Sequence, residues 1–391
     1  MKILEIGKLP VYMWAEDVEA GAMQQINNLS MFPYAFHHIA IMPDCHEGFG
    51  MPIGGVLSTR DVIIPNAVGV DIGCGMCAMR TDLKEIDVKS LNRIFNKLRE
   101  LIPLGFNHQT KKQDEAIMPK GYDISGMPVV KKEWEEALYQ LGTLGGGNHF
   151  IEIQKGSDGY IWAMIHSGSR NLGKQVADFY NKLAISFNEK EKSTVPKSHQ
   201  LAYLRIDSKE GRQYNEEMKF CVEFALANRK LMMERIASVL EEETHCGFIS
   251  WEGTRFINIA HNYAAEEEHF GCKVIVHRKG ATRALRGETG IVPGSQGSKS
   301  YIVKGKGNPE SFMSCSHGAG RKMGRNEARK KLNLEEERRK LESKKIIHAL
   351  RTPADLDEAS GAYKDIDLVM KLQADLVDIC IELTPLGVIK G

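Results

Sequence analysis

Short apolar runs that end in glycine turns constrain the fold of this chain more than any other feature of its sequence. Runs rich in β-branched and aromatic residues between glycines and prolines predict strands. Because these strands do not alternate regularly with helices, the pattern favours an α+β fold over a doubly wound parallel sheet. The runs are HHIAIMPDCHEGFGMPIGGV, VIIPNAVGVDIGCGMCAMRT, LGTLGGGNHFIEIQ, YIWAMIHSGSR, CKVIVHRKGAT, IVPGSQG and KSYIV.

Other segments have the three- to four-residue apolar spacing of helices. Val88–Leu101 predicts one helix, and Asn215–Glu243 carries the clearest apolar stripe. Arg255–Glu268 predicts another helix, with His261 among apolar neighbours, and the C-terminal tail predicts a helix and a strand. The polar stretch Lys111–Lys132 is expected to be a loop.

The composition is that of an ordinary globular chain. Of its 391 residues, 42% are hydrophobic and 26% are charged. No uncharged apolar run reaches the about 18 residues of a membrane span, and the N-terminus lacks the pattern of a secretory signal. We therefore expect a cytoplasmic protein, in which the eight cysteines are poor evidence for disulfides.

Charge is balanced overall but not locally. The chain has 52 basic and 51 acidic residues, whereas Arg321–Arg351 has twelve Lys or Arg and five Glu. This mostly helical segment is either a phosphate-facing surface or a solvated helix with pairs of opposite charge.

Familiar nucleotide-binding patterns are absent. There is no GxxxxGK[ST] loop, and LGTLGGGNH lacks the GxGxxG order and precedes a strand. Instead, several glycine turns carry a side chain that can bind metal or transfer a proton. These residues are Asp71, Cys74, Asn148, His149, His166 and His317.

Carboxylate, thiolate and imidazole together form a donor set for first-row transition metals. Asp71 and Cys74 lie three residues apart between glycines, and a thiolate can bridge two ions. His149, His166 and His261 would complete the set; alternatively, each is a hydrogen-bonded core histidine and Cys74 a buried thiol. The soft thiolate ligand suggests zinc, but a site for two ions suits manganese equally well. The lone CxxC of Cys74 and Cys77 lacks the second pair of a zinc ribbon.

His317 lies in SCSHGAGRKMGR. A neutral imidazole can form a covalent intermediate, and Arg321 four residues later can bind phosphate with two hydrogen bonds. The alternative is a polar turn that precedes a helix. If His317 is a nucleophile, activity falls as the pH drops below its pKa.

Nine motifs occur in the order found in the RtcB family of RNA ligases, which the chain resembles from about Met42 to Gly391. The resemblance implies a single large mixed domain over residues 1–391, with helical elaborations at 174–245 and 321–351. The motifs are MPDCHEG, GVDIGCGM, LGGGNHFIE, HSGSR, HRKGAT, PGSQG, SHGAGR, AYKDID and LTPLGVIKG.

The resemblance also implies residue roles. It makes His317 the histidine that becomes guanylylated. Arg170 and Arg325 resemble residues that hold an RNA phosphate. Two metal ions are implied, with Cys74 bridging, on Asp71, Cys74, His149, His166 and His261. The implied GTP contacts are Asn148, Phe150, Glu152, Ser295, Ser300, Gly320, Arg321, Tyr363 and Lys390.

The implied activity joins RNA 3′-phosphate or 2′,3′-cyclic phosphate ends to 5′-hydroxyl ends, with GTP and two Mn²⁺ ions. Such a ligase acts in tRNA splicing or RNA repair. The resemblance implies archease as an activating partner, and the alternative is a ligase that works without one. Two departures from the family pattern are DEASGAYKDID in place of DEAP-type sequence and PGSQG in place of PGSMG. Rival hypotheses are an RNA 3′-end guanylyltransferase that does not seal and a noncatalytic RNA-binding protein.

Overall fold

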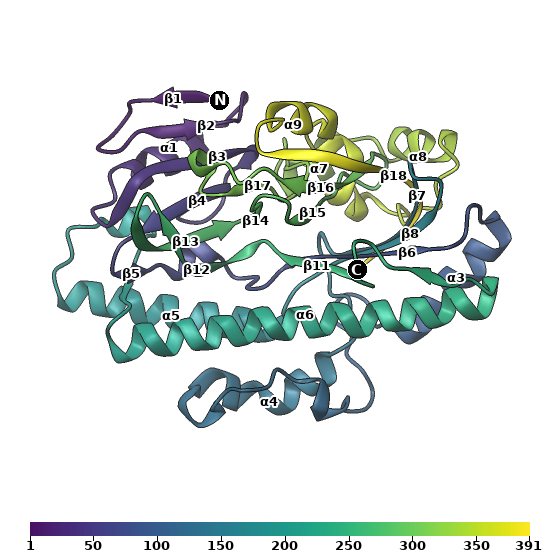
Figure 1. The fold of residues 1–391 in the computed structure, drawn as a ribbon, viewed down its shortest axis with the longest axis horizontal. Coiled ribbons are helices and arrows are strands. Elements are labelled where there is room, and N and C mark those ends of the chain that lie inside the picture. Colours follow the sequence, from purple (N-terminus) through teal and green to yellow (C-terminus); the bar gives the residue numbers. More distant parts are fainter.

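A computed structural model describes residues 1–391 as one mixed domain built around two sheets (Figure 1). The smaller sheet has six strands in the order β1 (Lys2–Leu4), β2 (Val11–Met13), β3 (Ala35–His46), β4 (Ile53–Thr59), β13 (Cys272–Lys279) and β12 (Asn262–His269). Only the β2–β3 pair is parallel. The expected α+β class is therefore confirmed.

The larger sheet has eight strands, all antiparallel to their neighbours. Its order is β10 (Phe248–Ile249), β6 (Gly75–Thr81), β8 (Ile161–Ser167), β7 (Phe150–Gly156), β18 (Val377–Lys390), β16 (Ser300–Gly305) and β15 (Thr289–Val292), with β11 (Ile257–Ala260) also paired to β6. Two small pairs join β14 (Ala281–Arg283) to β17 (Ser314–Ser316) and β5 (Val62–Ile63) to β9 (Leu204–Arg205).

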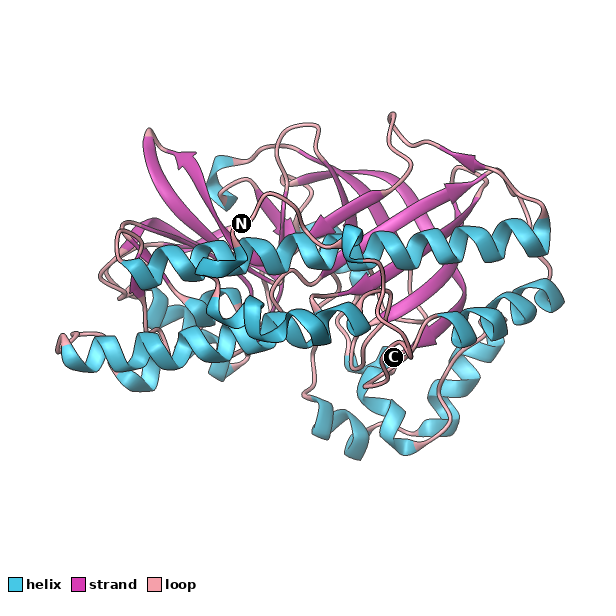
Figure 2. Cartoon of the chain, turned by 90° about the horizontal axis from the view of Figure 1, so that it is seen from below, coloured by secondary structure: helices cyan, strands magenta, loops and turns pink.

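The chain forms nine α-helices, and the long ones cross the face of the molecule that Figure 2 turns to the viewer. No helix has the length and apolar character needed to cross a membrane. The helices are α1 (Ala20–Ser30), α2 (Pro65–Val68), α3 (Val88–Leu101), α4 (Pro128–Gln140), α5 (Arg170–Lys190), α6 (Lys209–Thr244), α7 (Arg325–Lys331), α8 (Leu334–Ser343) and α9 (Ile366–Leu372).

The long helix α6 runs beneath strands of both sheets (Figure 1). Its N-terminal half packs Met218 and Phe224 into a core shared with α4 and α5. Its C-terminal half packs Met232 and Ile236 against α3, β7 and β8. The apolar stripe predicted over Asn215–Glu243 is confirmed, and it is the element that supports both sheets from one side.

Two helix predictions have different outcomes. The helix predicted at Val88–Leu101 is α3, and Asp87 caps it by accepting hydrogen bonds from the backbone N–H groups of Lys89 and Ser90 at 2.8 and 3.0 Å. The helix predicted at Arg255–Glu268 is wrong, since this segment forms β11 and β12. Pairing with β6 and β13 satisfies its backbone, and this tertiary context outweighs local helical composition.

Other segments can be compared with their predicted secondary structure. Residues 111–127 form a loop with two short 3₁₀ turns, but α4 already begins at Pro128, so the loop predicted to Lys132 is too long. The basic segment contains α7 and α8, and the tail forms α9 and β18 as expected. The elaboration expected at 174–245 contains most of α5 and all of α6.

Candidate functional site

Five predicted metal donors meet where the two sheets adjoin. Cys74 directly precedes β6, His149 precedes β7, and His166 lies on β8 of the larger sheet. His261 occupies the single position between β11, which belongs to the larger sheet, and β12, which belongs to the smaller one. Residues nearly two hundred positions apart in the sequence therefore face one another across this junction.

The donors form two groups that share one thiol. Asp71, Cys74 and His149 form the first group, and Cys74, His166 and His261 form the second; within each, the ligand atoms lie within 4.8 Å of one another. Cys74 Sγ is 3.2 Å from His166 Nε2 and 3.5 Å from His149 Nε2. These groups could hold metal ions, and Cys74 is the only donor common to both.

Hydrogen bonds orient two of the imidazoles. Nδ1 of His149 lies 3.0 Å from the carbonyl oxygen of Leu144, and Nδ1 of His166 lies 3.1 Å from that of Asn148. Each carbonyl can accept only from a protonated Nδ1, so Nε2 is left with a lone pair that faces the cluster. This is the arrangement of metal-binding histidines.

Burial disfavours charge in this cluster unless an ion is bound. It raises the pKa of the Cys74 thiol well above the ordinary value, and it lowers the pKa of both His166 and His261. Burial also opposes ionisation of Asp71, but the hydrogen bond and charge of His149 outweigh it and lower that pKa to about 2. Neutral imidazoles and a thiol that ionises on coordination fit a transition metal.

A buried arginine of α6 holds the segments that carry these donors. Arg229 Nη1 donates to the carbonyl oxygens of Gly73 and Ser167, both at 2.8 Å. Its Nη2 donates to Ile259 at 3.1 Å, and its Nε donates to the Asn258 side chain at 2.8 Å. Gly73 and Ser167 are the immediate neighbours of Cys74 and His166, and Ile259 lies two residues before His261.

The other cysteine of the CxxC pair does not belong to the cluster. Cys77 is fully buried on β6 within a core of aliphatic side chains, and burial raises the pKa of its thiol to about 12. All eight cysteines are free. Cys77 is thus a core residue rather than a ligand.

His317 lies beside the donors and is held by a carboxylate that the sequence analysis did not select. Its ring centroid is 4.8 Å from that of His261. Nδ1 of His317 lies 2.6 Å from Oδ2 of the fully buried Asp44, which also accepts the backbone N–H of His317 at 3.1 Å. Burial raises the pKa of Asp44, but the charge and hydrogen bond of His317 outweigh it and hold the pKa below its ordinary value.

In the neutral form of His317, the Asp44 carboxylate can accept only from a protonated Nδ1, which leaves Nε2 with a lone pair. It therefore selects the tautomer in which Nε2 can act as a nucleophile. Asp44 lies in the MPDCHEG motif. The only sequence clue to its role is an acidic residue within an apolar strand, and its partner lies 273 residues later in the chain.

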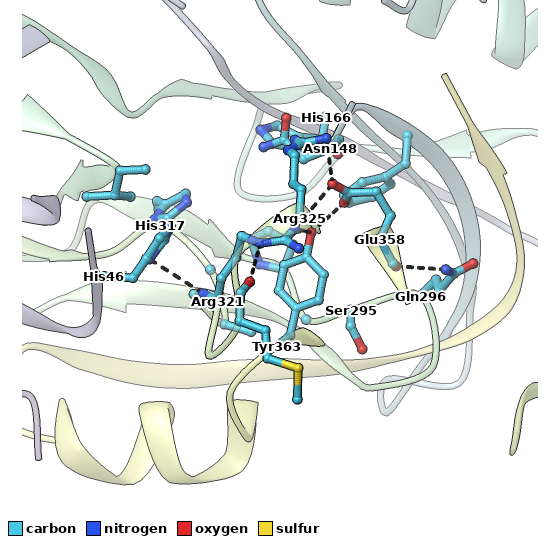
Figure 3. A pocket seen from close by; sticks show the side chains of 18 of the residues that line it. His46, Asn148, His166, Ser295, Gln296, His317, Arg321, Arg325, Glu358 and Tyr363 are labelled. Atoms are coloured by element: carbon cyan, nitrogen blue, oxygen red, sulfur yellow. Dashed lines mark hydrogen bonds and ion pairs between the residues drawn. The ribbon is translucent and has the colours of Figure 1, made fainter. Parts of the chain in front are cut away.

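A cavity of about 500 Å³, the first cavity, opens on one side of His317 (Figure 3). It is also lined by His166 and Arg325. Eight of the residues predicted to contact GTP line it, namely Asn148, Phe150, Glu152, Ser295, Gly320, Arg321, Tyr363 and Lys390.

Two predicted residues lie outside this lining. Ser300 is buried behind the wall, where its hydroxyl accepts hydrogen bonds from Gln154 Nε2 at 3.2 Å and from the Gly294 N–H at 3.1 Å. Arg170 is bound to the Thr143 hydroxyl at 2.8 Å and to the Gly105 carbonyl at 3.0 Å. Ser300 is thus placed to support the wall, and the structure does not bring it into the cavity.

Glu358 is the second residue that the sequence analysis missed. It is buried at the centre of the basic groups in the first cavity (Figure 3). Its carboxylate lies 3.3 Å from Arg321 Nη1, 3.1 Å from Arg325 Nη1 and 3.2 Å from Lys390 Nζ, and it also accepts the Tyr363 hydroxyl. Burial raises its pKa, but these cations outweigh it and hold the pKa below normal.

The pKa of Glu152 is shifted in the opposite direction to that of Glu358. The buried carboxyl of Glu152 lines the same cavity, and burial raises its pKa to about 8 despite the Gln154 amide and the charge of Lys390. In the absence of a ligand it is therefore largely protonated at pH 7 and ionises as the pH rises through about 8, and a ligand that supplies hydrogen-bond donors would favour the carboxylate.

Replacing Arg229 by Met should destabilise the protein strongly. The change removes the donor from four acceptors, of which the Gly73 and Ser167 carbonyls are buried, and each buried group left unpaired costs about 1–3 kcal/mol. We expect the free energy of unfolding in urea to fall by about 3 kcal/mol or more. Arg235→Met is the matched control on the same helix; its guanidinium is only partly buried, so water can replace its bonds and the loss should be smaller. Equal losses would contradict this account.

Comparison with known proteins gives one consistent result. The family model described as tRNA-splicing ligase RtcB matches residues 25–391. RNA-splicing ligase RtcB of Escherichia coli K12 is 38% identical over 415 residues, which cover all of this chain and 99% of that protein. The tRNA-splicing ligases RtcB of Nanoarchaeum equitans and Thermococcus kodakarensis are 33% and 31% identical, over 98% and 94% of this chain and 95% and 91% of theirs. The chain therefore belongs to the RtcB family of ligases.

Proposed function

We propose that this protein joins RNA ends that carry a 3′-phosphate or a 2′,3′-cyclic phosphate to RNA ends that carry a 5′-hydroxyl, using GTP and Mn²⁺. Relatives named as RNA-splicing ligases, similar along the whole chain, support an RNA ligase. The observation that carries the finer chemistry is His317, whose Nδ1 is bound to Asp44 and whose ring adjoins both the donor cluster and the first cavity.

Two ions are proposed, one on Asp71, Cys74 and His149 and the other on Cys74, His166 and His261. When bound, such ions would offset the negative charge of a triphosphate and help to orient it. The protein's own contribution is to hold five donors in place and to favour the Cys74 thiolate through the charge of the nearby Arg229.

His317 is proposed as the nucleophile. Nε2 attacks the α-phosphorus of GTP, a P–N bond forms, and the P–O bond to pyrophosphate breaks so that pyrophosphate leaves. A 2′,3′-cyclic end first adds water at phosphorus, the P–O2′ bond breaks, and the 2′-oxygen takes a proton to leave a 3′-phosphate. An oxygen of the RNA 3′-phosphate then attacks the phosphorus bound to His317, and the P–N bond breaks to release His317. Finally, the 5′-hydroxyl attacks the activated 3′-phosphorus, GMP leaves with the bonding electrons, and the hydroxyl proton passes to solvent.

The first cavity is proposed to bind GTP. Glu152 as a carboxylate can accept from the N1–H and N2 amine of guanine, donors that adenine lacks at those positions. Nζ of Lys390 lies 5.6 Å from the centre of the Phe150 ring, and this pair is proposed to contact the base. Asn148, Ser295 and Arg321 are proposed to bind phosphates, and Arg170 and Arg325 to hold an RNA phosphate. Ser300 is proposed only to support this wall, since it is bonded to Gln154 and Gly294.

Intact mass after incubation with GTP and Mn²⁺ tests the covalent step. We expect a GMP-sized adduct on the wild-type protein, none on His317→Ala, and none after a chelator has removed metal. A protein without the adduct, or an adduct that persists in the variant, would contradict the proposed nucleophile. With RNA ends added, capped RNA that accumulates unsealed would favour the guanylyltransferase alternative.

Asp44→Asn should slow formation of this adduct by roughly a hundredfold, because the amide no longer favours the tautomer with a free Nε2 and a positioned proton acceptor contributes about 10²–10⁴. The rate of adduct formation at saturating GTP measures this change. Adduct formation at the wild-type rate would show that Asp44 only supports the fold.

GTP affinity should rise with pH through the range set by Glu152. Binding needs the carboxylate, whereas the free protein holds a proton on a group with a pKa of about 8, so affinity should fall about tenfold per pH unit well below pH 8. Calorimetry at pH 7 in two buffers of different ionisation enthalpy should detect close to one released proton. Glu152→Gln should bind GTP more weakly and without this proton release; an unchanged release in the variant would assign it to another group.

A further inference from the structure

We propose that a second cavity, which adjoins the first, receives a single-stranded RNA end and that Phe49 stacks on a base of that end. This inference rests on the proposed function, because it assigns a place to the RNA. It concerns a residue outside the proposed metal, GTP and phosphate contacts.

The second cavity is large and leads to the reacting groups. Its volume is about 1120 Å³, above the about 300–1,000 Å³ typical of sites for one small ligand. His317, Cys74 and His261 are part of its lining, and residues of α5 line it as well. It meets the first cavity along a shared border formed by Glu47, Gly48, Phe49, Ile53, Asn148, His317 and Arg325.

Apolar side chains face this cavity instead of a core. Phe49, Val70 and Ile185 all line it, and they are 73%, 51% and 39% exposed. Leaving a phenylalanine this exposed forgoes the burial that ordinarily stabilises such a ring. Phe49 and the proposed nucleophile His317 both line the two cavities, so a ligand that enters the second cavity can cover the exposed ring.

The backbone that carries Phe49 is firmly held. Lys279 is buried, and its Nζ donates to the Phe49 carbonyl at 2.6 Å and to the Asn66 carbonyl at 2.9 Å. The N–H of the preceding Gly48 donates to Gln25 Oε1 at 3.1 Å. With the backbone held, only the two side-chain torsions of Phe49 remain to be ordered on binding, which suits a stacking platform.

The chemistry of the surroundings favours RNA. Every base has a π-face, so stacking on an aromatic ring tolerates any sequence, and cations beside the ring bind the backbone. Arg325 lines both cavities, and Lys192 and Lys197 line the second, where Lys197 is paired with Glu189 at 2.6 Å. Because Glu47, Asp71 and Asp178 also line the second cavity, stacking on the ring rather than net charge is the main contact expected. The guanine of GTP is not the expected occupant, because Glu152, Phe150, Tyr363 and Lys390 line only the first cavity.

The inference can be tested without GTP or catalysis by comparing the RNA affinity of the full-length protein and its variants for intact RNA and for RNA that lacks the terminal base. Fluorescence anisotropy would measure the affinity of two short labelled single-stranded RNAs. One presents a 5′-hydroxyl with a blocked 3′ end, and the other presents a 3′-phosphate with a blocked 5′ end. Each is used intact and with an abasic terminal nucleotide.

Phe49→Ala should weaken binding of at least one intact RNA by about tenfold, within the range measured for base–aromatic stacking. The abasic change should weaken wild-type binding similarly and should weaken the variant no further. Phe49→Trp should bind like the wild type. Phe270→Ala, which removes a 43%-exposed ring from the distant turn between β12 and β13, should leave affinity unchanged.

Dependence on Phe49 for either end supports the inference and identifies that end. Equal losses for intact and abasic RNA, no loss for either RNA, or a loss that Trp does not restore would each overturn it. A matching melting temperature excludes misfolding of the variants. Formation of the GMP adduct is measured separately. If RNA binding depends on Phe49 and the terminal base together but no adduct forms, this site is retained and the ligase chemistry is rejected. If the adduct forms but RNA binding does not depend on that pair, the ligase chemistry is retained and this site is rejected.

Discussion

The guanidinium of Arg229 is the interaction on which the geometry of the donor cluster depends. A charged group inside the protein is expensive unless every donor is paired, and here its bonds go to neutral acceptors beside three metal-donor positions. Its charge also favours the Cys74 thiolate, so one side chain contributes both position and charge. Burial lowers its own pKa to about 10, which still leaves it protonated under physiological conditions.

The sequence predicted those parts of the structure that depend on interactions between residues close together in the chain. Local patterns sufficed for α3 and α6, since capping and apolar spacing act within one element. They failed at Arg255–Glu268, where pairing with distant strands decides the structure. Asp44 and Glu358 were missed for the same reason: an acid in a strand or a short turn shows its partner only after the chain has folded.

The two departures from the family pattern prove to be neighbours. Gln296 of PGSQG is buried and donates from Nε2 to the Glu358 carbonyl at 2.8 Å. A Cβ built at Gly297 would come within 2.7 Å of the Ser360 hydroxyl, so the two loops are in close contact. A change in one loop alters the space left for the other, and both support the wall of the first cavity around Glu358.

Strand β18 has a consequence for how the molecule assembles. It lies between β7 and β16 in the larger sheet, yet more than two hundred residues separate it from β7 in the sequence. Until β18 pairs with it, β7 has an unpaired edge that can form hydrogen bonds with a strand of another chain. Such distant pairing is slow and favours aggregation of partly folded molecules. Overproduction at low temperature or alongside chaperones that cover exposed strands should therefore raise the yield of native protein.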